Sequence, residues 1–404
     1  MKKGEALTDV IIERTQEKIS DQENHEIGLI FVETAKEKGY TLKKPEDLLS
    51  LYFQQLYDSV GSFTGITPTK SLKTVNSEEY YIAMRDEQLS IRPSHLREYC
   101  LRVSDAYWYA DSEKFLELSN EDPIKFLSVF DNARHITKMA MLSTGTFSPH
   151  TNCIFIDIEK SEAFDYGVIF DISNKTGSIR QAHNEAISAQ RGNYKYHLGE
   201  ELAHSTHSGI TKQRDERLNE FMEIYEQFIQ NLVAFPENVL NSFLPTTLLI
   251  EGSKVHYIPL KDLSKCEKLY IIINTLGLDI RTDDLRKSVL KKLPSEMKRF
   301  HKRLTRFYMK SLIPWFVAEG YSKVVRDGIL SSDEDYQKAN MQIEGSLKKL
   351  DSWESSLISY RTLGENFVNK VYETLGRKTF RTLNKELPIV KELNDPSSYL
   401  SRTK

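Results

Sequence analysis

The sequence predicts an α+β fold, with a small split β core flanked by helices and a mainly α-helical C-terminal region. Runs rich in β-branched and aromatic residues, such as CIFIDIE (153–159), concentrate between residues 79 and 196. Segments that contain Gly and Pro separate these runs and are typical of turns. Long amphipathic stretches with apolar residues at helical spacing follow, as at 212–235 and 295–321.

The N-terminal part is predicted to be helical. Apolar residues recur at helical spacing over 5–38, and Pro45 opens a second helix with acids in its first turn. The segment EYYIAMRDEQLSI (79–91) is rich in Tyr and Ile, which predicts one or two short strands. Residues 94–105 and 122–142 predict helices.

The predicted β-rich part continues after these helices. The segment LSTGTFSPH (142–150) has the composition of a turn, and 153–159 and 166–173 predict strands. Gly192 followed by YKY predicts another turn and a strand at 192–196, and 247–260 predicts a hairpin. Most of the remaining chain, including 333–363, predicts helix. We therefore expect an N-terminal helical region (1–78), a β-containing catalytic core (79–210) and a mainly helical C-terminal domain (211–404).

Composition indicates a globular protein. The 404 residues are 39% hydrophobic and 28% charged, with a formal net charge of −3. This balance gives no general attraction to nucleic acid or to an acidic membrane, so no nucleic-acid partner is favoured. No apolar run approaches the length of a membrane span.

Cysteine usage and the N-terminal residues predict a cytoplasmic protein. Cys100, Cys153 and Cys266 are odd in number and far apart, which excludes a disulfide framework and a CxxC zinc pattern. The start MKKGEALTDV lacks the apolar core of a signal peptide. A bacterial effector that is secreted into a host cell without a cleavable signal peptide would share this feature, so that location stays open.

An ordered set of short motifs runs through the β-rich part. YYIAMR (80–85) comes first, and LSTGTF, GVIFDI, the turn SNKTGSI and HNEAISAQRGNYKYH (183–197) follow. This order resembles the mono-ADP-ribosyltransferase family of toxins and bacterial effectors. That family has an Arg on an early strand, a Ser-Thr-Ser motif and a Glu-x-Glu turn. The resemblance covers roughly residues 79–196, and its closest part is 185–196.

The resemblance implies NAD as a substrate and a protein or other macromolecule as the acceptor. The carboxylate of Glu185 would stabilise the ribosyl cation that forms when the glycosidic bond of NAD breaks. Ser143 would orient Glu185, Thr144 would set the strand at the NAD site, and the guanidinium of Arg85 would bind the pyrophosphate. His183 would lie at the position that activates the acceptor.

The chain departs from the family pattern at two positions. His183 stands where the family has the first Glu of Glu-x-Glu, which puts acceptor chemistry in doubt. Gly145 stands in place of the last Ser of Ser-Thr-Ser. Arg92, Arg97 and Arg102 are alternatives to Arg85.

Two other classes of function stay open. The chain could be a non-catalytic helical interaction protein whose β-rich part is structural. It could also be a metal-dependent hydrolase that uses HLGEELAHSTH (197–207). In a helix, His197, Glu200, Glu201 and His204 would share one side, with His207 as a further candidate. The segment EELAH resembles the zinc-peptidase motif HExxH with Glu in place of its first His.

The motif at 197–207 is incomplete for every metal centre that it resembles. A peptidase needs two His ligands, and a di-iron bundle needs a second Glu-x-x-His pair, which the sequence lacks. We therefore predict no zinc or iron bound by His197, Glu201, His204 and His207.

A basic segment near residue 300 is the last candidate. Lys and Arg with interleaved aromatic residues can bind nucleic acid or acidic lipid. The near-neutral whole chain favours a simpler interpretation, a solvated helix face. The basic residues are Lys291, Lys292, Lys298, Arg299, His301, Lys302, Arg303, Arg306 and Lys310.

Overall fold

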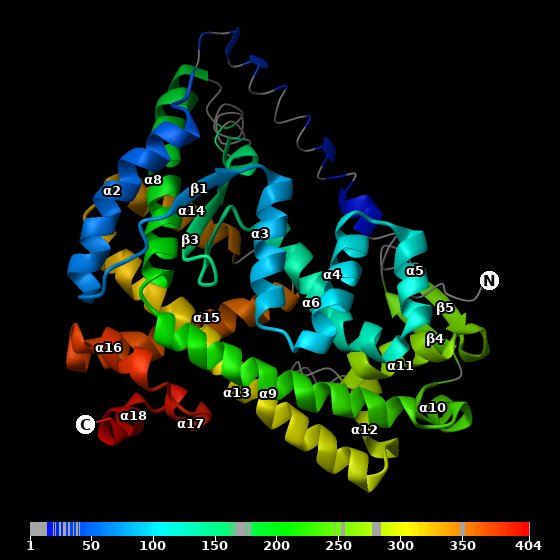
Figure 1. The fold of residues 1–404 in the computed structure, drawn as a ribbon. Helices are drawn as coiled ribbons and strands as arrows, with labels where there is room; N and C mark the ends of the chain where they lie inside the picture. The colour runs from blue at the N-terminus through cyan, green and yellow to red at the C-terminus, as the bar shows by residue number, and fades with distance from the viewer. Residues whose placement is uncertain are drawn as a thin grey trace. The chain divides into compact units, whose positions relative to one another are not determined.

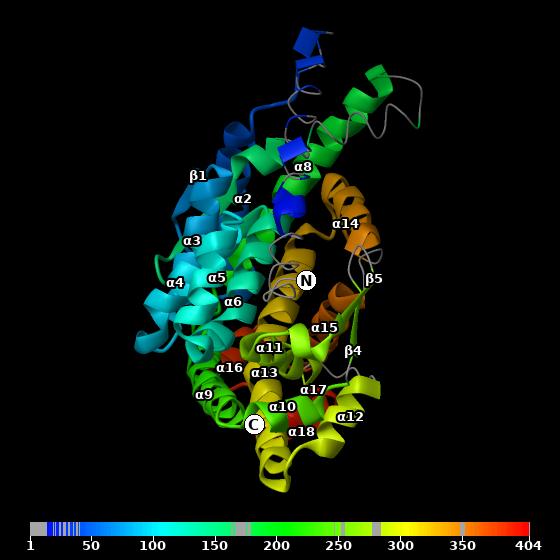
Figure 2. The ribbon, with the colours of Figure 1, turned by 90° about the vertical axis from the view of Figure 1, so that its right-hand side faces the viewer.

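The computed structural model describes residues 41–162, 179–245, 247–251, 255–276, 284–347 and 352–403, with Asp165, Lys175 and scattered residues between Arg14 and Gly39. These parts are mainly helical and include a three-stranded sheet and a two-stranded hairpin, which confirms the α+β prediction (Figures 1 and 2). None of the described helices combines the length and apolar character that crossing a bilayer requires.

The strands are β1 (Leu72–Val75), β2 (Gly145–Ser148), β3 (Cys153–Asp157), β4 (Thr247–Glu251) and β5 (Val255–Pro259). The helices of the first half are α2 (Pro45–Thr64), α3 (Ser77–Ser90), α4 (Ser94–Trp108), α5 (Ser112–Glu121), α6 (Pro123–Leu142) and α8 (Ile179–His204). The following helices are α9 (Ser208–Val233), α10 (Glu237–Phe243), α11 (Lys265–Leu276), α12 (Asp284–Lys292) and α13 (Ser295–Leu330), with a 3-10 turn η1 at Leu260–Asp262. The chain then forms α14 (Glu334–Leu347), α15 (Ser352–Leu375), α16 (Lys378–Lys385), α17 (Val390–Leu393) and α18 (Pro396–Arg402).

The chain folds into two compact units, each assembled from three separate segments. Unit 1 consists of Met1–Asp21, Gln88–Lys138 and Arg217–Met309. Unit 2 consists of Gln22–Glu87, Met139–Glu216 and Lys310–Lys404. Each unit has its own apolar core. Their discontinuous composition follows from long-range packing, which local sequence patterns do not report.

Aromatic side chains fill the core of unit 1. The rings of Phe115 and Phe126 meet edge to face at 5.1 Å, and Phe126 stacks on Phe130 at 5.4 Å. Such ring pairs stabilise a core by about 1 kcal/mol beyond the area that they bury. Apolar residues of α9, α11 and the first half of α13 complete this core.

The small sheet and α8 form the centre of unit 2. The strand order is β1-β3-β2, with β1 parallel and β2 antiparallel to β3. Ile154 and Ile156 of β3 are buried in the same core as Leu198 and Leu202 of α8. Helix α8 contacts both α2 and α14, which lie beside it (Figures 1 and 2). The last turns of α8 are thus held against the sheet.

The strand predicted at 79–91 is wrong, because these residues belong to helix α3. Two hydrogen bonds start this helix: Glu79 N donates to Asn76 Oδ1 at 2.8 Å, and Asn76 N donates to Glu79 Oε2 at 3.2 Å. This pair is a capping box, which satisfies two backbone N–H groups at a helix start. Tyr80, Tyr81 and Met84 then face the interior at helical spacing. Capping and burial together override the β propensity of Tyr and Ile.

The strand predicted at 192–196 is also wrong, because α8 continues through it. Gly192 is not part of a turn. A Cβ atom at Gly192 would lie 2.1 Å from the carbonyl oxygen of Asp335, at the start of α14. The glycine therefore permits the close approach of two segments that the sequence pattern does not connect.

Other predictions are confirmed. Strand β3 lies within 153–159, and the hairpin predicted at 247–260 is β4–β5. The helices predicted at 212–235 and 295–321 are α9 and α13. The turn predicted at 142–150 is not confirmed over its whole length, because Gly145–Ser148 forms strand β2 and pairs with β3. The strand predicted at 166–173 lies outside the described residues.

Candidate functional site

The structure does not bring Glu185 to Ser143. Glu185 is exposed on α8, and its carboxylate accepts a hydrogen bond from Gln181 Nε2 at 3.0 Å. Ser143 Oγ lies 2.8 Å from the hydroxyl of Tyr80 and donates to the carbonyl of Gly145 at 2.6 Å. Among the described residues, no hydrogen bond joins Glu185 to Ser143.

The length of α8 explains this separation. Thr144 Oγ1, next to Ser143, lies 3.1 Å from His197 Nε2. His197 follows Glu185 by twelve residues in the same helix, which at 1.5 Å per residue is about 18 Å. His183 lies further from Thr144 along α8, and its Nε2 donates to the carbonyl of Thr41 at 3.2 Å.

Arg85 lies on α3, so the early strand that would carry a pyrophosphate-binding Arg is absent at this position. Its guanidinium forms an ion pair with Asp86 at 2.9 Å and lies 5.7 Å from the centre of the Tyr81 ring. The side chain is thus engaged by its own helix.

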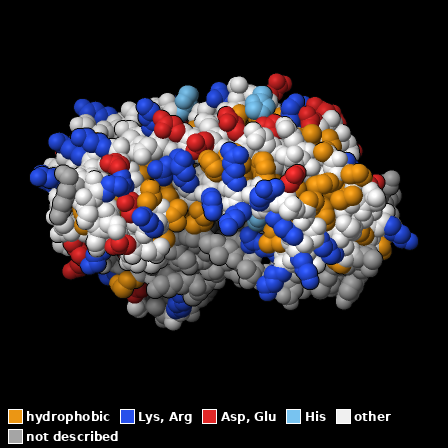
Figure 3. All heavy atoms as spheres, turned by 90° about the horizontal axis from the view of Figure 1, so that it is seen from below, with side chains coloured by type: hydrophobic (Ala, Val, Ile, Leu, Met, Phe, Trp, Pro, Cys, Tyr) orange, Lys and Arg blue, Asp and Glu red, His pale blue; other side chains and the backbone are white. Residues whose placement is uncertain are grey.

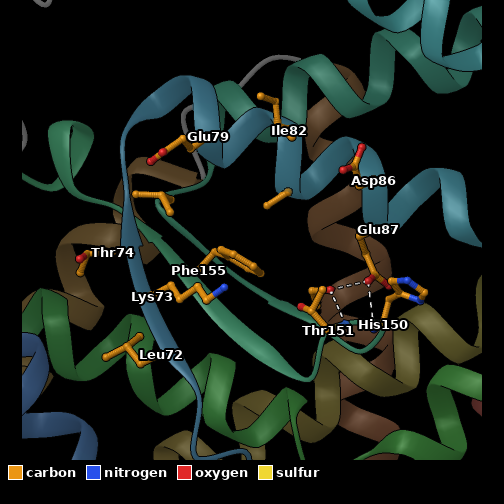
Figure 4. Close-up of a pocket in the computed structure, with 13 residues that line it drawn as sticks. Leu72, Lys73, Thr74, Glu79, Ile82, Asp86, Glu87, His150, Thr151 and Phe155 are labelled. Atoms are coloured by element: carbon orange, nitrogen blue, oxygen red, sulfur yellow. Dashed lines mark hydrogen bonds between the residues drawn. The ribbon is translucent and has the colours of Figure 1, made fainter.

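A pocket of about 670 Å³ opens beside β1, β3 and α3 (Figure 4). Apolar side chains, including Ile82 and Phe155, form part of its lining. Its charged lining residues are Lys73, Glu79, Asp86 and Glu87. The carboxylate of Glu87 accepts hydrogen bonds from Ser148 Oγ at 2.7 Å and from His150 N at 3.2 Å. Two of its three carboxylates are paired with arginines, Asp86 with Arg85 at 2.9 Å and Glu87 with Arg214 at 3.5 Å.

A different cluster lies at the end of α8. Glu200 and His204 are one helical turn apart, and Glu319 of α13 faces them. One ligand atom from each residue lies within 4.8 Å of the other two. His204 Nε2 is 4.0 Å from a carboxylate oxygen of Glu319. All three side chains are partly buried, between 12% and 18% exposed.

His207 orients His204. His204 Nδ1 lies 2.7 Å from His207 Nε2, and the rings meet edge to face at 4.9 Å. Burial, together with the neighbouring His204, lowers the pKa of His207 well below its usual value, so this ring is neutral at pH 7. His207 Nδ1 lies 3.4 Å from Thr211 Oγ1. When that Nδ1 carries the proton, His207 Nε2 accepts from His204 Nδ1–H, and His204 presents the lone pair of Nε2 toward Glu319.

Arg326 holds Glu200 from the other side. Its buried Nη1 donates to Glu200 Oε2 at 2.8 Å, and its guanidinium carbon lies 3.7 Å from the centre of the Tyr196 ring. The Nη2 atom of Arg326 is buried and has no hydrogen-bond partner among the described residues. A buried donor without an acceptor costs about 1–3 kcal/mol, which an oxygen atom of a bound group would recover.

A close approach of α13 and α15 fixes Glu319. A Cβ atom at Gly320 would lie 2.4 Å from the carbonyl carbon of Gly364 in α15. The approach requires glycine at both positions, because a Cβ atom at either one would clash with the other helix. Glu319 directly precedes Gly320, so this helix contact also fixes the position of Glu319 opposite His204.

The remaining residues of the 197–207 segment have other partners. His197 bonds to Thr144, and Glu201 Oε2 accepts from Phe147 N of β2 at 2.6 Å. Both therefore bind the strand side of α8, whereas Glu200 and His204 face α13. These four residues were predicted to share one side of the helix, but in the structure they lie on two different sides. The sequence analysis missed Glu319, because no local motif connects it with the EELAH segment.

The three facing groups are one imidazole and two carboxylates, which suit Zn²⁺ and leave a coordination position for water or substrate. Ligand atoms around Zn²⁺ lie roughly 3.4 Å apart, so the three side chains would have to draw together by roughly 1 Å. In a bound state, His207 and Arg326 would hold the ligands from behind, as outer-shell partners do at metal centres.

No protein-family model, curated protein or solved structure matches this chain.

Proposed function

We propose that the chain is a metal-dependent hydrolase whose centre consists of Glu200, His204 and Glu319. The observation that carries the proposal is the convergence of three ligand atoms from two helices within 4.8 Å. His207 supports it: when its Nδ1 carries the proton, its Nε2 accepts from His204 Nδ1–H and leaves His204 Nε2 free to bind a metal. Mono-ADP-ribosyl transfer stays a prediction that rests on the sequence resemblance alone.

A zinc ion in this position would supply a bound water with a pKa of about 7 as the nucleophile. The protein's own contribution is to hold that position. Glu200 is fixed by Arg326, His204 by His207, and Glu319 by the helix contact at Gly320. Glu201 does not act as a general base in this arrangement, because its carboxylate is bonded to the backbone of Phe147.

The first test is metal content. We expect the full chain, loaded with Zn²⁺ and dialysed, to retain one equivalent of zinc by elemental analysis. His204→Ala and Glu319→Gln should each lose it, since two ligands bind Zn²⁺ weakly. His197→Ala is the matched control, because His197 lies two turns earlier on the same helix and faces Thr144. Retention of zinc by His204→Ala, or no zinc in the unaltered chain, would refute the site.

The second test is hydrolysis. Zinc-loaded protein should cleave p-nitrophenyl acetate or p-nitrophenyl phosphate faster than zinc alone, and a chelator should abolish the difference. His197→Ala should keep this rate, and His204→Ala should lose it. Zinc retention without any such rate would refute hydrolysis and leave a metal-binding site.

A further inference from the structure

The second half of α12 and the start of α13 carry a dense set of basic side chains in unit 1. All seven are exposed, and between residues 291 and 306 the only acidic residue is Glu296. We call this set the basic face. It consists of Lys291, Lys292, Lys298, Arg299, Lys302, Arg303 and Arg306.

Carboxylates do not pair with the basic face among the described residues. None of its seven side chains forms an ion pair with a carboxylate in the part of the chain that the structure describes. Other bases of unit 1 are paired, such as Arg102 with Glu121 and Lys268 with Glu237. His301, which lies between the bases, is buried, and this burial lowers its pKa, so it adds no charge at pH 7. The face is therefore a region of strong positive charge on a chain whose net charge is −3.

Packing fixes the helix segment that carries these bases. Leu293, Met297 and Leu304 are buried in the unit 1 core, which anchors the inner side of the segment. Lys298 Nζ donates to the carbonyl of Lys291 at 2.7 Å and ties α13 to the end of α12. A partner would therefore meet bases carried on a helix whose backbone is already in place, so only their side chains have to be ordered on binding.

The arrangement on α13 is long and curved. From Lys298 to Arg306 the helix rises about 12 Å, and the five bases of α13 spread over an arc of about 140° at 100° per residue. Duplex DNA carries one charge per about 1.7 Å of its axis, so a stripe of this length spans about seven phosphates. A partner that reaches all five bases must wrap partly around the helix, as the walls of a nucleic-acid groove do.

We propose that the basic face binds the phosphate backbone of a nucleic acid without sequence specificity. Guanidinium and ammonium groups on one helix match closely spaced phosphates. A membrane fits less well. A flat lipid surface reaches a narrower arc of the helix, and the large apolar side chains that are exposed in the described chain all lie outside 284–309. The face that includes this end of α13 carries many Lys and Arg side chains (Figure 3). The proposal is independent of the metal site, which lies in unit 2.

The test uses the full chain and a fluorescein-labelled DNA duplex of arbitrary sequence, about 20 base pairs long. Fluorescence anisotropy should show binding at low salt. The logarithm of the association constant should fall with the logarithm of salt concentration with a slope of about −4 to −6, as expected for five to seven phosphate contacts. The triple variant Arg299→Gln/Lys302→Gln/Arg306→Gln should make that slope less steep by about 3 and weaken binding at least about tenfold.

The control removes the same charge elsewhere. Lys378, Lys385 and Lys391 are exposed in unit 2, and their triple change to Gln should leave duplex binding unchanged. Circular dichroism checks that each variant is folded. Equal binding by the basic-face variant and the unaltered chain would overturn the proposal. So would an absence of duplex binding at low salt, including the case in which vesicles containing phosphatidylserine bind through the same three residues.

Discussion

His204 Nδ1 lies 2.7 Å from His207 Nε2, and the other nitrogen of His204 faces the carboxylate of Glu319. The neutral, buried His207 therefore acts as a positioning residue for the candidate metal ligand. Because the pair spans the end of α8, the imidazole direction depends on the turn between α8 and α9.

The first prediction concerns His207. His207→Phe keeps a ring against Tyr321 but removes the ring nitrogen that lies 2.7 Å from His204 Nδ1. Zinc affinity should fall about 10- to 100-fold, the usual effect of losing an outer-shell partner. Competition with a chromogenic chelator measures it. His150→Ala, an exposed histidine in the same unit, should leave the affinity unchanged. Equal affinities for His207→Phe and the unaltered chain would show that the hydrogen bond has no role in metal binding.

The second prediction concerns Arg326. Arg326→Met leaves the carboxylate of Glu200 without its buried cation, which should lower the free energy of unfolding by about 3–5 kcal/mol. A bound Zn²⁺ would replace part of the lost positive charge. Thermal unfolding should therefore show a larger zinc-induced rise in Tm for this variant than for the unaltered chain.

Lys323→Met is the matched control, because Lys323 lies one turn before Arg326 and pairs with Glu365 at 3.1 Å. It should lose less stability and show no extra response to zinc. A zinc response of Arg326→Met no larger than that of Lys323→Met would contradict a metal at Glu200.

The third prediction is a pH dependence that Asp165 sets. Burial raises the pKa of Asp165 to about 7, although Gln190 Nε2 and the Tyr194 hydroxyl donate to its carboxylate at 2.7 and 3.2 Å. Because the folded pKa lies above the unfolded value near 3.8, the contribution of Asp165 to the free energy of unfolding is most favourable at low pH. This contribution falls as pH rises from about 4 to 7. Asn does not titrate, so Asp165→Asn should remove this fall in the free energy of unfolding.

Urea unfolding at two pH values measures the effect. We expect Asp165→Asn to be more stable than the unaltered chain by about 1–4 kcal/mol at pH 8 and no more stable at pH 4. Asp58→Asn, at an exposed position in α2, should have little effect at either pH. A gain of the same size at both pH values would rule out titration of Asp165 as its cause.

The fourth prediction concerns NAD. The family resemblance makes Glu185 the residue that cleaves the glycosidic bond, whereas its place on α8, about 18 Å along the helix from His197, separates it from Ser143. We expect Glu185→Ala to leave any release of nicotinamide from NAD unchanged. Nicotinamide release by the full chain, followed by chromatography, is the measurement.

Gln181→Ala is the control for this comparison. Gln181 lies one turn before Glu185 on α8, is also exposed, and donates to the Glu185 carboxylate. Its substitution therefore alters the same surface but keeps the carboxylate. NAD cleavage that disappears in Glu185→Ala and persists in Gln181→Ala would support the transferase interpretation and contradict our expectation.

Local sequence patterns determined most of the helices and two of the β elements. Apolar residues at helical spacing give α9 and α13, and the run of Ile and Phe at 153–157 gives β3. The hairpin β4–β5 also follows from its own residues. These elements could be predicted because the signals that specify them lie within short stretches of the chain.

Tertiary packing decided α3 and the course of α8. Tyr80, Tyr81 and Met84 lie in a segment whose composition favours a strand, but burial on one side of a capped helix outweighs that preference. Gly192 has the residue type of a turn, but the backbone of Asp335 lies against it. In both cases the deciding contact comes from outside the local segment.

The candidate site depended on packing even more. The sequence alone shows Glu200 and His204 one turn apart, which indicates a shared side of a helix but not a third ligand. Glu319 reaches them only because α13 lies against this end of α8. The same contact lets Arg326 of α13 donate a hydrogen bond to Glu200. No spacing rule connects residues on two helices so distant in the chain, because their separation is set by the side chains packed between them.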